Sequence, residues 1–229
     1  MRILVVNPNT TASMTEKIGA AARKVARPGT EIIAVNPASG PAAIEGYYDE
    51  AMSLQGLLQL IRQRPDHDAV VIACFDDSGL DAARCISDRP VIGIGEAAYH
   101  MAALVANKFS VVTTLARSVP ALEHNLQRYG LAARCVRVRS SEVAVLELER
   151  PGSDARNRIS KEIDRALAED RAEAIVLGCA GMADLAGDLS RQHGVPVLDG
   201  VSAAIGLAEA MVHLGLKTSR LGGYAPPSR

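Results

Sequence analysis

The chain of 229 residues is poor in aromatic side chains and has almost no excess charge. It contains no tryptophan, two phenylalanines and five tyrosines, and its formal net charge is −1. Proteins that bind nucleic acid or an anionic membrane usually present a basic surface. Single-stranded nucleic acids are commonly stacked on aromatic rings. The composition therefore argues against nucleic acid and membrane surfaces as partners and leaves small molecules as the expected ligands.

The sequence also lacks the long hydrophobic stretches of exported or membrane-anchored proteins. Its first ten residues show a strand pattern, with no basic segment leading into a long apolar run, so no signal peptide is predicted. The most apolar long window, residues 197–216, carries Asp199, Glu209 and His213. Such a window is typical of a buried or amphipathic helix rather than a membrane span. We expect a cytoplasmic protein.

Residues that hold metals or cofactors are sparse. The five histidines show no ligand spacing with cysteines or acids, so no metal site is predicted. The lysines lie outside the cysteine segments, which gives no sign of a pyridoxal Schiff base. We expect no cofactor. Without an export signal, free thiols are the better expectation than disulfides for the four cysteines, Cys74, Cys85, Cys135 and Cys179.

Two similar segments stand out against this background. Residues 69–80 read AVVIACFDDSGL, and residues 174–185 read AIVLGCAGMADL. Each begins as an apolar run typical of a buried parallel strand, reaches a cysteine and continues through small residues into a helical pattern. Ligands of open α/β sheets bind at the carboxyl ends of the strands. Cys74 and Cys179 are therefore predicted to lie at equivalent strand ends.

The similarity continues along both halves at a nearly constant offset. The two cysteines are 105 positions apart (179 − 74), and the prolines that follow them are 106 apart (196 − 90). The apolar start of the chain, from residue 3, matches the segment from residue 109 at an offset of 106 (109 − 3). A constant offset across three segments indicates two copies of one αβ unit.

Strands alternate with helices throughout, which predicts parallel sheets flanked by helices. We predict an α/β protein with two pseudo-symmetric lobes and the active site between them. The first lobe would comprise residues 1–95 plus 200–229, and the second residues 96–199. The long loop at 36–46 could be a lid or a plain surface excursion. Residues 140–153 are expected to be irregular, and the tail from residue 216 to form no regular element.

Two thiols on opposite sides of a small molecule suit proton exchange at carbon. One thiolate removes a proton from one face while the other thiol supplies one to the opposite face. Both cysteines are predicted to precede helix starts, where amide N–H groups favour the anion and lower a pKa near 8.5. Asp76 and Asp77 oppose a thiolate, so we expect them to point away from the site or to act through other residues.

A free cysteine at a buried strand end is usually just a small hydrophobic residue. The repeat symmetry favours catalysis for Cys74 and Cys179, whereas Cys85 and Cys135 are expected to be structural. Polar residues at matching strand ends, 7–10 and 113–114, could orient a neutral polar ring or simply cap helices. Residues 93–98 match the dinucleotide fingerprint G-x-G-x-x-A, but the strand after them lacks a ribose-binding acid.

With these motifs in place, the chain resembles the aspartate/glutamate/hydantoin racemase superfamily, and within it the hydantoin and allantoin racemase branch. The resemblance runs from Met1 to about Thr218. It is carried by six segments, each weak alone and specific together: 7–10 (NPNT), 44–46 (IEG), 72–75 (IACF), 112–115 (VTTL), 176–182 (VLGCAGM) and 199–201 (DGV).

The resemblance implies cofactor-independent racemisation at C5 of 5-substituted hydantoins, with Cys74 and Cys179 as the two acid/base residues. It also implies an oligomer. Ile44 and Phe75 would line the pocket for the substituent. The pair Asp77-Ser78 departs from the family pattern, in which a proline is common there. The residues that would hold the hydantoin ring are Asn9, Ser78, Gly79, Thr113, Thr114 and Gly181.

Several alternatives stay open at this point. Allantoin, a hydantoin with a ureido group at C5, is the nearest rival substrate, and an amino acid such as aspartate is more remote. Arylmalonate decarboxylases resemble this architecture but need only one of the two cysteines, so the presence of both argues against that activity. A non-enzymatic protein that binds a small molecule is the rival from a different class.

Overall fold

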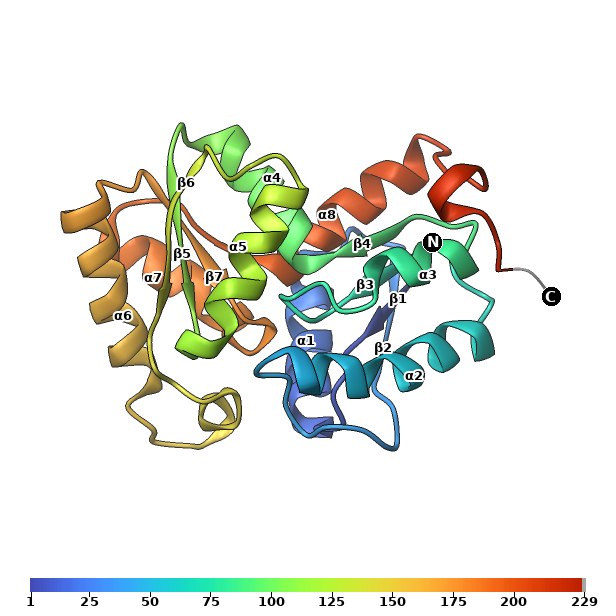
Figure 1. Ribbon diagram of the computed structural model, residues 1–229, viewed down its shortest axis with the longest axis horizontal. Helices are drawn as coiled ribbons and strands as arrows, with labels where there is room; N and C mark the ends of the chain where they lie inside the picture. Colours follow the sequence, from blue (N-terminus) through green and yellow to red (C-terminus); the bar gives the residue numbers. More distant parts are fainter. Residues whose placement is uncertain (228–229) are drawn as a thin grey trace.

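The computed structural model describes residues 1–227 and contains two four-stranded parallel sheets (Figure 1). The first sheet has the strand order β2-β1-β3-β4 and the second the order β6-β5-β7-β8, so the second repeats the first four strands later. The predicted α/β class with two pseudo-symmetric lobes is confirmed. The strands are β1 (Arg2–Val6), β2 (Glu31–Val35), β3 (Ala69–Ile72), β4 (Val91–Gly93), β5 (Phe109–Thr113), β6 (Cys135–Ser140), β7 (Ala174–Gly178) and β8 (Val197–Asp199).

Helices connect successive strands and cover the sheets. The α-helices are α1 (Ala12–Val25), α2 (Tyr47–Gln63), α3 (Leu80–Ile86), α4 (Ile94–Val105), α5 (Val119–Arg128), α6 (Ala155–Arg165), α7 (Ala186–His193) and α8 (Gly200–His213). A π-helical turn, η3 (Ala166–Asp170), extends α6. Short 3-10 helices are η1 (Ala116–Ser118), η2 (Val145–Glu149), η4 (Ala180–Leu185) and η5 (Gly222–Tyr224). Two of them correct the sequence expectations, because η2 lies in the segment expected to be irregular and η5 lies in the tail.

The central strands are buried on both faces. Every residue of β3, β5 and β7 is buried, and these strands are rich in valine and isoleucine. Helices on both faces of a parallel sheet produce this pattern, which is why the strands read as continuous apolar runs. Because β3 and β7 occupy equivalent places in the two sheets, the residues that follow them are brought to equivalent sheet edges.

Helices α4 and α8 lie between the two sheets and join them through one hydrophobic core (Figure 1). That core includes Val5 of the first sheet and Val111 of the second. Tyr99 of α4 is fully buried in it, edge-on to Phe75 at 5.4 Å between ring centroids and stacked on Phe109 at 6.2 Å. The two sheets therefore share their interior, and the division into residues 1–95 plus 200–229 and 96–199 stays a prediction. Within the described residues, no helix combines the length and apolarity that a membrane crossing needs.

Candidate active site

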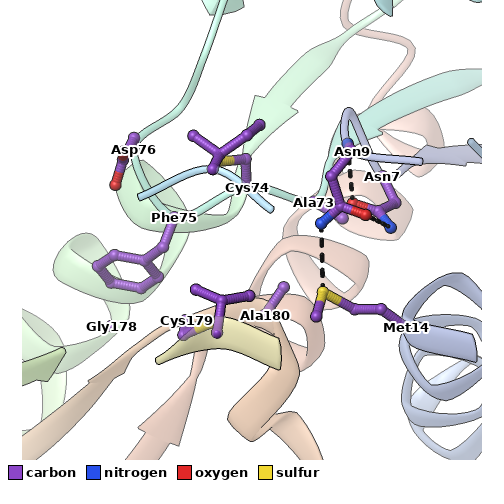
Figure 2. Close-up of a pocket in the computed structure, with 12 residues that line it drawn as sticks. Asn7, Asn9, Met14, Ala73, Cys74, Phe75, Asp76, Gly178, Cys179 and Ala180 are labelled. Carbon is purple, nitrogen blue, oxygen red and sulfur yellow. Dashed lines mark hydrogen bonds between the residues drawn. The ribbon is translucent and has the colours of Figure 1, made fainter. Parts of the chain in front are cut away.

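A pocket opens at the carboxyl ends of the central strands, and both repeat cysteines line it. Cys74 follows β3 and Cys179 follows β7, and Figure 2 shows Cys74 above and Cys179 below in the middle of the pocket. All described cysteines are free thiols. The pocket is lined by Asn7, Asn9, Met14, Ile44, Ala73, Cys74, Phe75, Asp76, Val145, Gly178, Cys179 and Ala180.

The approach of β7 to β5 places Cys179. Gly178 pairs with Thr113, and a side chain at Gly178 would put its Cβ 2.8 Å from the Thr113 Cβ, so only glycine fits there. The Thr113 hydroxyl donates to the Gly178 carbonyl at 2.9 Å. Thr113 therefore holds the end of β7, and Thr114 is buried beside it. Neither residue lines the pocket, so their contact with substrate stays a prediction.

The Cys74 thiol receives hydrogen bonds from the Ser78 hydroxyl and the Asp76 N–H and sits in an unfavourable field. The Ser78 hydroxyl donates to Cys74 Sγ at 3.4 Å. Burial raises the pKa of the Cys74 thiol well above its usual range, and the Asp76 carboxyl adds to the effect. The expected helix start beside Cys74 is wrong, because α3 begins six residues later at Leu80 (80 − 74). Gly79, in the left-handed region at φ 69°, ends the intervening turn rather than lining the pocket.

Two neighbours of Cys179 favour its thiolate form. Cys179 directly precedes η4, as expected, and the backbone N–H of Gly181 bonds to the thiol and lowers its pKa. Burial dominates and raises the pKa of Cys179 to about 12; the Asp76 carboxyl adds to the rise, and the ammonium group of Lys17 opposes it. In this closed pocket both sulfurs are held as thiols, and the two sites differ in how readily a thiolate forms.

Asp77 points away from the pocket, as expected, and holds α4 in place. Its carboxylate accepts hydrogen bonds from the N–H groups of Gly95 at 2.9 Å and Glu96 at 2.7 Å, and from the Tyr129 hydroxyl at 2.7 Å. Burial nevertheless raises its pKa to about 7. A Cβ at Gly93 would lie 2.1 Å from Asp77 Oδ1, so the glycines of the G-x-G motif make room for this carboxylate. Asp77 occupies the amides that a dinucleotide phosphate would need.

Asp76 does not point away, so the sequence expectation is wrong for this residue. It lines the pocket next to Cys74, and its Oδ2 atom is buried without a hydrogen-bond partner among the described residues. Burial raises its pKa to about 7, and the neighbouring Glu50 and Asp77 carboxyls contribute. The signal available in the sequence was the asymmetry of the repeat, because the position matching Asp76 is Gly181 (181 − 76 = 105).

The pair Asn7 and Asn9 forms the polar wall on the other side of the cysteines (Figure 2). Asn7 Nδ2 donates to Asn9 Oδ1 at 2.9 Å, and Asn9 Nδ2 donates to Met14 Sδ at 3.3 Å. Asn9 Oδ1 also accepts from the N–H of Thr11 at 2.9 Å, so Asn9 both shapes the start of α1 and lines the pocket. Met14 was missed because its position on a helix gives no sign of a site.

Two loops cover the pocket. The loop 36–46 supplies Ile44, and the segment before and within η2 supplies Val145, which sequence reasoning missed. They are joined across 100 residues of chain, because the Glu45 carboxylate accepts a hydrogen bond from the N–H of Val145 at 2.8 Å. The pocket has a volume of about 30 Å³. A five-membered ring needs more room, so the pocket must widen to admit a substrate. Of the two readings of loop 36–46, its position favours the lid.

The described residues contain no cluster of three or more His, Cys, Asp or Glu side chains arranged to hold a metal ion. The residues lining the pocket include no lysine, arginine or histidine. The pocket therefore offers two thiols, one carboxyl group and two amides within an apolar surround. These groups can exchange protons with a neutral polar molecule.

Comparison with known proteins agrees with this arrangement. The Asp/Glu/Hydantoin racemase family matches residues 3–208. A hydantoin racemase from Rhizobium meliloti is 49% identical over 99% of this chain and 95% of its own length, and one from Pseudomonas sp. (strain NS671) is 46% identical over 100% and 93%. An allantoin racemase structure from Klebsiella pneumoniae superposes with a TM-score of 0.98 at 49% identity, covering 100% of this chain and 94% of that one.

The chain belongs to the Asp/Glu/hydantoin racemase family. As a member at this level of identity over its full length, it is an isomerase, a racemase. The two parallel four-stranded sheets are the racemase fold. The family assignment argues against a purely non-enzymatic binding protein. The question that follows is which carbon this racemase acts on.

Proposed function

We propose that this racemase interconverts D- and L-5-monosubstituted hydantoins by two-base proton transfer at C5, with allantoin as the alternative substrate. The observation that carries the proposal is the placement of two thiols, from matching positions of a repeat, in one pocket. The relatives named hydantoin racemase support the substrate class. The absence of a cation from the pocket lining disfavours free amino acids, whose α-carboxylate needs a positive partner.

In the proposed reaction one cysteine acts as base and the other as acid. The thiolate takes the C5 proton as the C5–H bond breaks and its electron pair moves into the adjacent carbonyl. The second thiol then gives its proton to the opposite face of C5. The enzyme ends with the thiolate on the other sulfur, so the next molecule of the opposite enantiomer restores the first state.

Formation of the thiolate is linked to opening of the pocket. Burial opposes ionisation of both Cys74 and Cys179 in the closed form. When the covering loops separate, water can solvate the sulfur and its pKa falls. The Ser78 hydroxyl and the Gly181 N–H then remain as hydrogen-bond donors to the two sulfurs once substrate has displaced the water.

The proposal is tested by NMR and polarimetry in D2O with single enantiomers of 5-isopropylhydantoin. The wild type should lose optical rotation while deuterium appears at C5. Cys74→Ser and Cys179→Ser should each abolish racemisation, because a serine hydroxyl is too weak an acid to replace a thiol. Each variant is expected to retain C5 exchange on one enantiomer, the one whose proton faces the remaining thiol.

Cys85→Ser and Cys135→Ser serve as matched controls, because these thiols lie on α3 and β6, outside the pocket. Both should behave as the wild type. Full racemisation by Cys74→Ser or Cys179→Ser would eliminate the two-thiol mechanism. Tight binding of hydantoins by the wild type without any C5 exchange would identify a binding protein instead.

A further inference from the structure

The pocket is asymmetric in one respect that two-thiol chemistry does not require. Asp76 follows Cys74 by two positions, whereas Gly181 follows Cys179 by two positions. Asp76 is the one residue of the pocket lining that carries a carboxyl group, and the second copy has no counterpart to it. It is therefore the one carboxyl group there that can accept a hydrogen bond from a bound molecule.

The Asp76 carboxyl group is arranged to receive a hydrogen bond that the described residues do not supply. Within residues 1–227, Oδ2 is buried and has no hydrogen-bond partner. The backbone at Asp76 is fixed, because Asn125 of α5 donates its Nδ2 to the Asp76 carbonyl at 2.8 Å. Buried carboxylate oxygens in folded proteins normally have a donor, since an unpaired one costs free energy. A donor on a bound substrate would remove this cost.

The location of Asp76 indicates which part of a substrate it would meet. In Figure 2 Asp76 and Phe75 lie on one side of the two cysteines, and Asn7, Asn9 and Met14 lie on the other. The substrate carbon must sit between the sulfurs, so a molecule in this pocket extends polar groups to both sides of that carbon. A 5-alkylhydantoin has a polar ring on one side only. Allantoin has the ring on one side and a ureido group on the other.

Resting on the proposed function, we infer that Asp76 is a specificity-determining residue whose Oδ2 accepts an N–H of a C5 ureido group. The protein accordingly prefers allantoin to hydantoins with apolar substituents. A site built to bond a donor rejects the analogue that lacks it, because the buried oxygen is then left unpaired. A bond from Asp76 to a ring N–H would not distinguish between substrates, since every hydantoin carries the ring N–H groups.

The test compares kcat/KM for allantoin and 5-isopropylhydantoin, each corrected for uncatalysed racemisation. Asp76→Asn keeps the shape and removes the charge, and Asp76→Leu removes the acceptor. We expect a loss of about 10- to 100-fold on allantoin, the range for a hydrogen bond to a charged group. Activity on 5-isopropylhydantoin should fall much less than activity on allantoin, or rise. Asp88→Asn, at an exposed carboxyl, is the matched control and should leave the ratio of the two unchanged.

Each outcome decides the inference. The inference is overturned if the ratio of kcat/KM for the two substrates is unchanged in both Asp76 variants. If that happens through an equal loss on both substrates, Asp76 contacts the hydantoin ring that both substrates share. A wild type that racemises 5-isopropylhydantoin but not allantoin also overturns the inference and leaves the proposed function standing. A wild type that racemises neither rejects the proposed function itself. Thermal unfolding of both variants shows whether a loss comes from misfolding, and the substrate ratio is insensitive to the amount of folded enzyme.

Discussion

At the scale of single residues, the two cysteines differ more than their matching positions suggest. Burial and the Asp76 carboxyl raise the pKa of both thiols. The Ser78 hydroxyl and the Asp76 N–H offset this at Cys74, whereas the Gly181 N–H and the field of Lys17 offset it at Cys179. We expect the two directions of racemisation to show different pH profiles.

The Ser78 hydroxyl is the group to remove in order to test how Cys74 is held. Ser78→Ala deletes the donor to Cys74 Sγ, so the pKa of that thiol should rise further. We expect kcat to fall by about 3- to 10-fold in the direction that uses Cys74 as base, the range for one neutral hydrogen bond. The acidic limb of the kcat profile in that direction should move up in pH, because it reports the pKa of the base. An unchanged profile would show that Ser78 acts only in the turn.

A second residue-scale prediction concerns Asp76 and pH. Burial, together with the Glu50 and Asp77 carboxyls, raises the pKa of Asp76 in the folded state from its ordinary value of 3.8 to about 7. The folded state therefore holds more protons than the unfolded state between these values, and stability falls as pH rises through 7. Asp76→Asn should gain stability relative to the wild type at pH 8 and little at pH 5. Urea unfolding at both pH values measures this, and equal differences would contradict it.

At the scale of elements, the contacts made by the loops that cover the pocket were the hardest to predict from the sequence. Strand positions and the two cysteines could be predicted because buried parallel strands are apolar and the repeat offset aligns their ends. Met14, Val145 and the bond from Val145 to Glu45 could not, because they depend on contacts between segments that share no offset. Asp76 was misplaced because its charge suggested repulsion from a thiolate and gave no sign of burial.

The Glu45–Val145 bond predicts how the lid behaves. Glu45→Ala removes the acceptor, so the loops should separate more readily and enclose the substrate less well. We expect KM to rise by about 3- to 10-fold and amide exchange to accelerate at residues 143–149. Glu16→Ala, at an exposed position of α1, is the control. Unaltered exchange at η2 would show that the bond does not hold the lid closed.

At the scale of the whole molecule, the tail from residue 216 contacts helix α3 from outside the pocket. Arg220 donates to the carbonyls of Arg84, Cys85 and Ser87 at 3.1, 2.9 and 2.9 Å, at the carboxyl end of α3. These are the unpaired carbonyls that end any helix. Because α3 follows the Cys74 turn, the tail supports one wall of the site. The predicted cytoplasmic location and homo-oligomer remain predictions.

Arg220→Ala should therefore lower the free energy of unfolding by about 1–3 kcal/mol, the usual range for hydrogen bonds from a charged group. Chemical denaturation measures the change. Lys217→Ala, at an exposed position in the same tail, should have an effect below about 0.5 kcal/mol. Equal effects of the two substitutions would mean that the tail does not hold α3.

The core that Tyr99, α4 and α8 build between the sheets bears on how such a chain could have arisen. A protein consisting of one repeat alone would leave that apolar surface open to water and would need a second copy of itself to cover it. Linking two such partners end to end would give a chain with the present arrangement. Linked copies can change separately, so a glycine can occupy in one copy the position that an aspartate occupies in the other.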